Sequence, residues 1–203
     1  SYLIEGGPTK SYNKTRGMLI SEPEIWNRLM EKLADMSIEY LSMQARAGAN
    51  ALQIFDSWVG AVNSTEYEQA IFPHMKRIIS TVKSRFPNLP LAMNGVGTDH
   101  LVSTWAKLPL DVIALDWRSS LGAAKDRGVT QTVQGNLDPA YLYGDTKTIA
   151  KVVDEILMDG VRHGKHVFNL GHGVFPEADP AKLHWLTDYV HEKSRELWAR
   201  ESR

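Results

Sequence analysis

Short apolar runs alternate along the chain with longer amphipathic segments, which predicts strands alternating with helices. Five runs have the length and composition of buried strands: 51–55, 91–93, 112–115, 132–134 and 166–170. Helices are expected over 64–85, 98–107, 119–127, 145–163 and 180–199. This order is typical of a parallel sheet with crossover helices, so the pattern predicts the α/β class.

A further helix is expected to begin near Ser21-Glu22-Pro23-Glu24, because this segment has the capping-box spacing and a proline in the first turn. Apolar positions then recur at spacings of three and four and form one stripe: Ile25, Leu29, Leu33, Met36, Tyr40, Met43 and Ala47. Gly48 is placed to end the helix. The stripe predicts the face of this helix that packs on the core.

The remaining sequence patterns concern a further strand, the starts of two helices and the extent of the domain. Tyr2-Leu3-Ile4 is read as a further strand, and Asp138-Pro139 and Asp179-Pro180 each read as an N-cap followed by a proline at the first helical position. Neither a low-complexity linker nor a shift in composition interrupts the sequence. We therefore expect one domain over residues 1–203.

A polar residue follows each of the five predicted strands. Asp56, Asn94 and Asp116 follow their strands directly, while Asn136 comes after Gly135 and His172 after Gly171. In a closed (β/α) barrel the strand ends converge on one face and carry the chemistry, and in an open sheet they line a crevice. The alternative is that each one only caps the helix that follows it.

The number of units leaves both architectures open. A barrel needs eight units, the sequence supplies five or six, and an open sheet of that size would be complete. No strand leads into a G-x-G-x-x-G or G-x-x-x-x-G-K-[ST] phosphate loop, which many open nucleotide-binding sheets carry.

Composition and charge remove several functional classes. The chain has 203 residues, with 23 Lys and Arg against 24 Asp and Glu, so it lacks the basic surplus expected of a nucleic-acid partner. It contains no cysteine, which excludes disulfides, thiolate nucleophiles and cysteine-ligated metals, and which fits a cytoplasmic location. No apolar stretch is long enough to cross a membrane, so no membrane association is expected.

Five motifs occur in a specific order along nearly the whole chain. They are Tyr2-Leu3-Ile4-Glu5-Gly6-Gly7, the segment from Gln53 to Gly60 (QIFDSWVG), Leu115-Asp116-Trp117, the segment from Gln134 to Pro139 (QGNLDP), and Asn169-Leu170-Gly171-His172-Gly173. Together they closely resemble the uroporphyrinogen decarboxylase family. Any one of these motifs alone would be weak, but the ordered set is specific.

The resemblance implies a (β/α)8 TIM barrel, usually a homodimer, that uses no metal or organic cofactor. It implies a carboxy-lyase that decarboxylates the four acetate arms of uroporphyrinogen III to give coproporphyrinogen III, in the cytoplasmic biosynthesis of haem and chlorophyll. Family members carry well over a hundred residues before the position matching Tyr2, including an arginine-rich segment and a central aspartate. We therefore expect an incomplete barrel that lacks its N-terminal strands, is inactive alone, and pairs with the missing N-terminal segment of the same enzyme.

Three site positions carry over from the family, and each also fits the chemistry. Tyr2 matches the active-site tyrosine of Y-x-x-E-G-G, Ser57 the serine of F-[DE]-S, and His172 the histidine of N-L-G-H-G. Tyr2, Ser57 and His172 are expected to bind substrate carboxylates, with Tyr2 and His172 in supporting catalytic roles. From residue type alone, His172 could equally be structural, Tyr2 a buried strand residue and Ser57 a helix cap.

Other residues are candidates by position only. Asp56 and Asp116 could act as general acids or bases, or could orient neighbours, and Arg118 could meet a substrate carboxylate. His163 and His166 straddle a helix end, a spacing that argues against a metal pair.

Two other functional classes compete with the decarboxylase hypothesis. Corrinoid-dependent methyltransferases resemble this family in fold, but their zinc site generally depends on cysteine, which this chain lacks. A non-catalytic tetrapyrrole-binding or scaffolding barrel would keep the fold without the chemistry. Retention of Tyr2, Ser57 and His172 together argues against that origin, but such a role could describe how this chain behaves alone.

Overall fold

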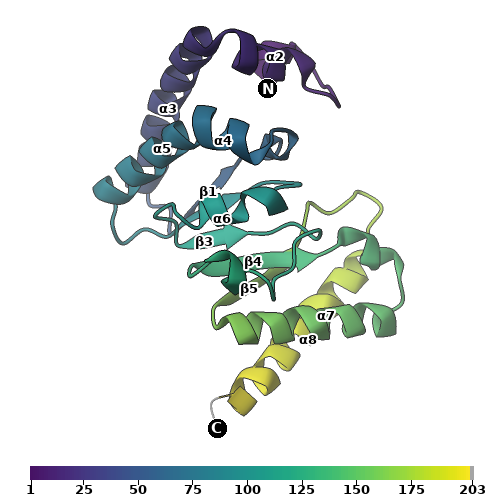
Figure 1. Ribbon diagram of the computed structural model, residues 1–203. Coiled ribbons are helices and arrows are strands. Elements are labelled where there is room, and N and C mark those ends of the chain that lie inside the picture. The colour runs from purple at the N-terminus through teal and green to yellow at the C-terminus, as the bar shows by residue number, and fades with distance from the viewer. Residues whose placement is uncertain (202–203) are drawn as a thin grey trace. The chain divides into compact units, whose positions relative to one another are not determined.

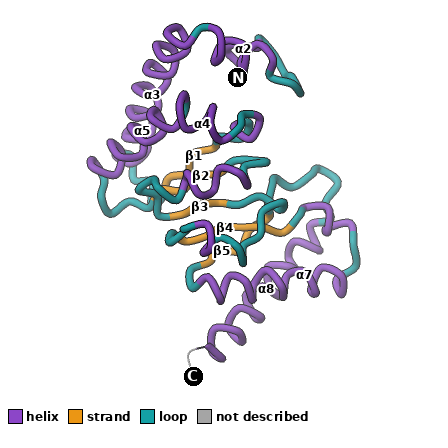
Figure 2. The backbone as a smooth tube through the Cα atoms, viewed as in Figure 1, coloured by secondary structure: helices purple, strands orange, loops and turns teal. Residues whose placement is uncertain are grey.

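The structure is a computed structural model that describes residues 1–201. The chain divides into two compact units, the first spanning Ser1–Asp111 and the second beginning at Val112. Within each unit the paired strands run parallel, and helical segments alternate with the strands along the chain (Figures 1 and 2). The α/β class predicted from the hydrophobic pattern is therefore confirmed.

The first unit begins with helices and then adds two strands. Its elements are α1 (Tyr2–Glu5), α2 (Asn13–Ser21), α3 (Pro23–Arg46), β1 (Leu52–Phe55), the 3-10 helix η1 (Val59–Ala61), α4 (Ser64–Ala70), α5 (Phe72–Arg85), β2 (Leu91–Asn94), the 3-10 helix η2 (Asp99–Leu101) and α6 (Val102–Trp105). In the parallel pair of β1 and β2, Leu52 lies opposite Leu91 and Phe55 lies opposite Asn94.

The prediction of a strand at Tyr2-Leu3-Ile4 is wrong, because these residues form helix α1. The helix is a single turn, and the chain leaves it through Gly6, whose φ of 77° lies in the left-handed region that favours glycine. Glu5 fixes α1 against α2 because its Oε1 accepts a 2.8 Å hydrogen bond from the Thr15 amide. A run of three apolar residues is too short for its periodicity to distinguish a strand from a helical turn.

Helix α3 forms with Pro23 in its first turn, but the capping box expected at Ser21 is wrong. Ser21 ends α2, and the N-cap Glu22 makes no side-chain cap hydrogen bond. A different face of α3 is also buried. Its buried residues are Trp26, Ala34, Ile38, Leu41 and Ser42. Met36, Tyr40 and Met43 of the predicted stripe are instead 61, 60 and 53% exposed. The buried row begins one residue further along, which is about 100° around the helix axis. It includes Ala34 and Ser42, small residues that permit a close approach of α5, whose Arg85 donates to Ser42 Oγ at 3.0 Å.

The helix expected over 64–85 is two helices, α4 and α5, which separate at Ile71. Pro73 occupies the second position of α5, where its missing amide proton is not needed. Helix α4 begins with a capping box, in which Asn63 Oδ1 accepts from the Glu66 amide at 2.8 Å and Glu66 Oε2 accepts from the Asn63 amide at 3.0 Å.

The second unit, as described up to residue 201, contains three strands. Its elements are β3 (Val112–Ala114), the 3-10 helix η3 (Lys125–Arg127), β4 (Thr132–Leu137), the 3-10 helix η4 (Pro139–Tyr143), α7 (Thr146–His163), β5 (His166–Leu170) and α8 (Pro180–Glu201). Strand β4 pairs in parallel with both β3 and β5.

Two local predictions in the second unit need correction, and the predicted caps hold. Strand β4 continues to Leu137 rather than ending at Gln134, so Asn136 lies inside the strand. The helix expected over 119–127 is only the short 3-10 helix η3. The caps are confirmed, because Asp138 accepts from the Ala140 amide and Asp179 from the Ala181 amide, each at 2.9 Å.

The core of the second unit lies between α7, α8 and the end of β4. It consists of Leu137, Leu142, Ile149, Val153, Leu157, Leu186 and Val190. Polar contacts hold α8 in place around this core. Tyr189 donates to Asp154 of α7 at 2.8 Å, and Lys182 donates to the carbonyls of Leu142 and Gly144 at 2.9 and 2.7 Å.

Candidate functional site

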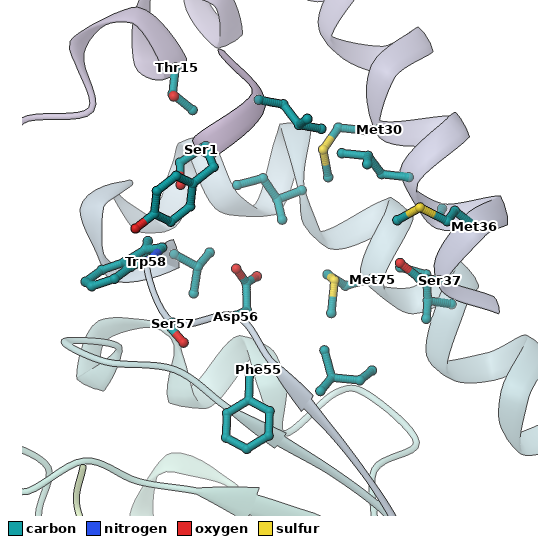
Figure 3. Close-up of a pocket in the computed structure, with 18 of the residues that line it drawn as sticks. Ser1, Thr15, Met30, Met36, Ser37, Phe55, Asp56, Ser57, Trp58 and Met75 are labelled. Atoms are coloured by element: carbon teal, nitrogen blue, oxygen red, sulfur yellow. The ribbon is translucent and has the colours of Figure 1, made fainter. Parts of the chain in front are cut away.

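The first unit contains a cavity of about 690 Å³ that Tyr2 and Ser57 both line. Its walls come from α1, α2, one side of α3, the end of β1, η1 and α5. Figure 3 shows Met30 and Met36 of α3 and Met75 of α5 on one side of the space, with Trp58 on the other. The structure thus brings two of the three predicted site residues to one apolar cavity.

Asp56 brings a carboxyl group into this cavity. It directly follows β1, and its amide donates to the Asn94 carbonyl at 2.8 Å, which extends the strand pairing by one bond. In Figure 3 the Asp56 carboxyl points into the cavity, while Phe55 points the opposite way, as expected for successive residues of a strand. Both residues line the cavity, and the alternation of the strand turns the Asp56 carboxyl into it and the Phe55 ring away from that carboxyl.

The surroundings of Asp56 change its acidity. Burial raises the pKa of the Asp56 carboxyl to about 6. Burial also raises the pKa of the Tyr67 hydroxyl, and the negative charge of Asp56 adds to that effect. A carboxyl group with a pKa near 6 exchanges its proton close to neutral pH, which is the property needed in a general acid or base.

Ser57 and Trp58 complete the polar end of the cavity. Ser57 is partly buried in the turn after β1, and Trp58 tilts against Tyr12 of the segment before α2, with 6.1 Å between ring centroids. The aromatic pair joins the turn after β1 to the N-terminal segment, so both walls of the cavity are fixed to each other.

Two residues of α2 belong to this cavity and were not found from the sequence. Thr15 and Arg16 line it, and within residues 1–201 the buried Thr15 hydroxyl and the buried Arg16 Nε have no hydrogen-bond partner. Arg16 Nη2 reaches Glu66 at 3.3 Å. The segment before Ser21 carries no clear hydrophobic period, so α2 itself was not predicted and its side chains could not be assigned to a wall.

His172 lies in the second unit, two residues beyond β5, and contacts Trp117. The two rings meet edge to face, at 84° and with 6.0 Å between centroids. Gly171 makes this contact feasible, because a Cβ at that position would lie only 2.5 Å from the Trp117 amide nitrogen. The first glycine of the Asn-Leu-Gly-His-Gly motif, Gly171, is therefore explained by the close approach of two strand ends.

Asp116 and Arg118 form an ion pair next to this ring contact. Asp116 is fully buried, and its two carboxyl oxygens accept from the Arg118 amide and from Arg118 Nη1, each at 2.9 Å. The Arg118 guanidinium lies over the Trp117 ring, 3.8 Å from its centroid. Asp116 thus positions Arg118, while Arg118 itself remains half exposed.

Other polar residues at strand ends have structural roles. Asn136 is buried and donates its amide to the carbonyls of Asp116 and Ser119, at 2.8 and 2.7 Å. His163 and His166 bond through Nε2 to the carbonyls of Gln131 and Gly135, at 2.8 and 2.7 Å. These side chains hold the ends of the strands in place.

Residues 1–201 hold neither a metal-binding cluster nor a membrane-spanning helix. Within this range, no group of three or more histidine, aspartate or glutamate side chains is arranged to hold a metal ion. In the same part of the chain, none of the helices combines the length and apolar character needed to cross a membrane.

Comparison with known proteins gives a consistent family match. Residues 1–193 match the family model described as uroporphyrinogen decarboxylase (URO-D). The chain is 52% identical over 192 residues to uroporphyrinogen decarboxylase of Geobacillus sp. (strain WCH70), covering 95% of this chain and 55% of the relative. The corresponding enzyme of Bacillus subtilis (strain 168) is 51% identical over 195 residues, with 96% and 55% covered. The chain therefore spans about half the length of these relatives.

A solved structure described as a methyltransferase from Methanosarcina mazei shares the fold. It aligns with a TM-score of 0.75 at 16% sequence identity and covers 93% of this chain but 54% of that protein. At this identity the likeness concerns the fold alone. With the parallel strands described above, it confirms the predicted fold class, a (β/α) barrel of which this chain supplies a part.

Proposed function

The chain belongs to the uroporphyrinogen decarboxylase family, and we propose that the full-length protein removes the carboxyl groups from the four acetate arms of uroporphyrinogen III. The product is coproporphyrinogen III, an intermediate of haem and chlorophyll biosynthesis. The observation that carries the proposal, beside the family match, is that Tyr2, Asp56 and Ser57 line one cavity. Since the chain spans about half of its relatives, the activity is proposed for the full-length protein.

The reaction needs a proton donor and a site that stabilises a positively charged ring. Protonation of a pyrrole carbon makes the ring an electron sink, so the electron pair left by the departing CO2 moves into the ring and forms an exocyclic methylene. Protonation of this methylene carbon and loss of the proton from the ring carbon then give the methyl group. Asp56, with its pKa raised to about 6, is suited to hold or release that proton. Its ionised form, in an apolar cavity, would also stabilise a cationic ring.

The substrate carries eight carboxylates, so the site also needs hydrogen-bond donors that bind these groups. Tyr2 and Ser57 offer hydroxyl groups in the cavity of the first unit. His172 offers an imidazole at the end of β5, positioned by Trp117. We assign these three residues to carboxylate binding, with Tyr2 and His172 also supporting the proton transfers.

We further propose that a segment of the full-length protein outside this chain covers the exposed apolar side of α3. Met36, Tyr40 and Met43 stand more than half exposed on this helix, and Met36 and Tyr40 line the cavity. Isolated exposed apolar residues are common, but three on one side of a helix next to a cavity indicate a contact surface. The N-terminal segment expected from the family resemblance is the partner that we assign to it.

A homodimer and a cytoplasmic location complete the proposal. Both are supported by the family match, and the relatives described above are bacterial. When this chain is studied alone, its behaviour should be that of a tetrapyrrole-binding protein without turnover, since it spans only about half of these relatives.

The test is the formation of coproporphyrinogen by the full-length protein, in parallel with the 203-residue chain. The full-length protein should form the product and the chain alone should not. His172→Ala in the full-length protein should lower kcat about ten- to a hundredfold, the effect of losing one hydrogen bond to a charged group in the transition state. His184→Ala, at an exposed position of α8, is the matched control. Absence of product from the full-length protein, or unchanged kinetics in the His172 variant, would contradict the assignment.

A further inference from the structure

Arg118 is held more firmly than an exposed arginine usually is. Its Nη1 donates to Asp116 Oδ2 at 2.9 Å, and its guanidinium lies over the Trp117 ring at 3.8 Å from the centroid. Asp116 cannot turn away, because it is fully buried and also accepts the Arg118 amide. Contacts from one edge and one face therefore fix the plane of the guanidinium.

The side chain of Arg118 nevertheless remains 52% exposed. A guanidinium carries five N–H donors, and in the described part of the chain Asp116 accepts the hydrogen bond from Nη1. The rest of the planar fork is available to a ligand. Because the plane is already fixed, a bound carboxylate would cost little of the side-chain entropy that a free arginine loses on binding.

The position of Arg118 places this donor next to a predicted site residue. Trp117 contacts the guanidinium of Arg118 and, edge to face, the ring of His172. Arg118 follows β3 and His172 follows β5, while β4 lies between these strands with the same direction. The guanidinium of Arg118 and the imidazole of His172 thus contact the same indole at the carboxyl edge of the strands.

We propose that Arg118 is a specificity-determining residue that binds, beside His172, a carboxylate that the reaction leaves in place. This inference rests on the proposed function. A guanidinium stabilises a carboxylate more than it stabilises neutral CO2, so it would slow the loss of a group that reacts. Arg118 is therefore suited to one of the four carboxylates that coproporphyrinogen retains.

Binding of coproporphyrin III, the oxidised product, gives a test that does not depend on turnover. In the full-length protein, fluorescence titration should show a dissociation constant at least tenfold higher for Arg118→Gln than for the unchanged protein. Arg118→Lys, which keeps the charge but not the planar fork, should be intermediate. Arg162→Gln is the matched control, since Arg162 pairs with Asp159 at 3.1 Å on α7 in the same unit, and it should change binding less than twofold.

A second variant separates ligand binding from a purely structural role for Arg118. If Arg118 served only to neutralise buried Asp116, the Asp116→Asn, Arg118→Gln double variant would recover both the thermal midpoint and coproporphyrin binding. If Arg118 binds the ligand, binding stays weak in the double variant even where the midpoint recovers. Recovery of binding, or a dissociation constant within twofold for Arg118→Gln, overturns the inference. Failure of the unchanged protein both to bind coproporphyrin and to form coproporphyrinogen would instead remove the proposed function, and this inference with it.

Discussion

The indole N–H of Trp105 donates a 3.0 Å hydrogen bond to the hydroxyl of Tyr67, and both side chains are completely buried. The bond joins α6 to α4 in the first unit. Tyr67→Phe should lower the free energy of unfolding by about 1–3 kcal/mol, because the buried Trp105 donor loses its acceptor. Urea denaturation of the 203-residue chain measures this change.

Tyr40→Phe provides the control for this prediction. Tyr40 is 60% exposed on α3, so removal of its hydroxyl should change stability by less than about 0.5 kcal/mol. Equal effects of the two substitutions would show that the buried bond contributes nothing specific.

Asp56 should make the stability of the chain depend on pH in a defined window. Burial raises its pKa from 3.8 to about 6, so between these values the folded state binds the proton more tightly than the unfolded state. The stabilisation that the bound proton gives to the folded state is therefore lost as pH rises from about 4 to about 6, and it remains lost above pH 6. Asp56→Asn should be more stable than the unchanged chain by about 1–3 kcal/mol at pH 7, since a tenfold change in an acid dissociation constant corresponds to about 1.4 kcal/mol.

The same experiment contains its own control. Below pH 3.8 Asp56 is protonated in both the folded and unfolded states, so the difference between the variant and the unchanged chain should shrink as the pH falls toward that value. A difference that is independent of pH would mean that the substitution acts through packing rather than through the charge.

The sequence predicted the strands well because each is a short apolar run between clear boundaries. All five observed strands overlap their predicted runs, and α7 and α8 fall close to their predicted ranges. The buried face of α3 was missed because this helix carries apolar residues on two sides. The pattern favoured the larger side chains, such as Met36 and Tyr40, whereas close packing against α5 selected Ala34 and Ser42.

The candidate site was predictable only in part. The rule that functional residues follow strand ends identified Asp56, Asp116 and His172. This rule depends only on the order of residues along the chain. Their different roles depend on contacts that the sequence does not encode locally: Asp116 pairs with Arg118, while Asp56 points into a cavity. Thr15, from a helix without a clear hydrophobic period, carried no signal at all.

Gly160 should resist substitution although it lies inside α7, where alanine is normally favoured. A Cβ at this position would overlap the His166 ring, and that ring is held by the 2.7 Å contact between its Nε2 and the Gly135 carbonyl. Gly160→Ala should therefore destabilise the chain by about 1–3 kcal/mol, which thermal or urea denaturation would measure.

Removing the His166 ring should reduce this effect. In a His166→Ala background the contacts with Nδ1 and Cγ disappear and the Cβ of residue 166 remains 2.8 Å from the added methyl group, so Gly160→Ala should cost at least about 1 kcal/mol less than in the unchanged chain. The double-mutant cycle measures the coupling between the two positions. If Gly160→Ala already stabilises the unchanged chain, the steric explanation is wrong.

The 203-residue chain, studied alone, should self-associate through the first unit. Met36, Tyr40 and Met43 of α3 expose apolar surface to water, and Phe55 on β1 is 67% exposed. Burial of apolar surface contributes about 25 cal/mol per Å², so a few hundred Å² rival the net stability of a domain. Sedimentation velocity should show species larger than the monomer at micromolar concentrations.

Charged substitutions on this side of α3 should reduce the association and identify the surface. Met36→Lys and Met43→Glu both replace exposed apolar groups, so they should shift the chain toward the monomer without lowering its thermal midpoint. Asn27→Lys, at an exposed polar position of the same helix, is the control and should leave the distribution unchanged. The prediction would be contradicted by a chain that stays monomeric and whose amides in α3 and β1 are strongly protected from hydrogen exchange. The exposed apolar side of α3 would then not lower the stability of the monomer measurably, and it would need no partner.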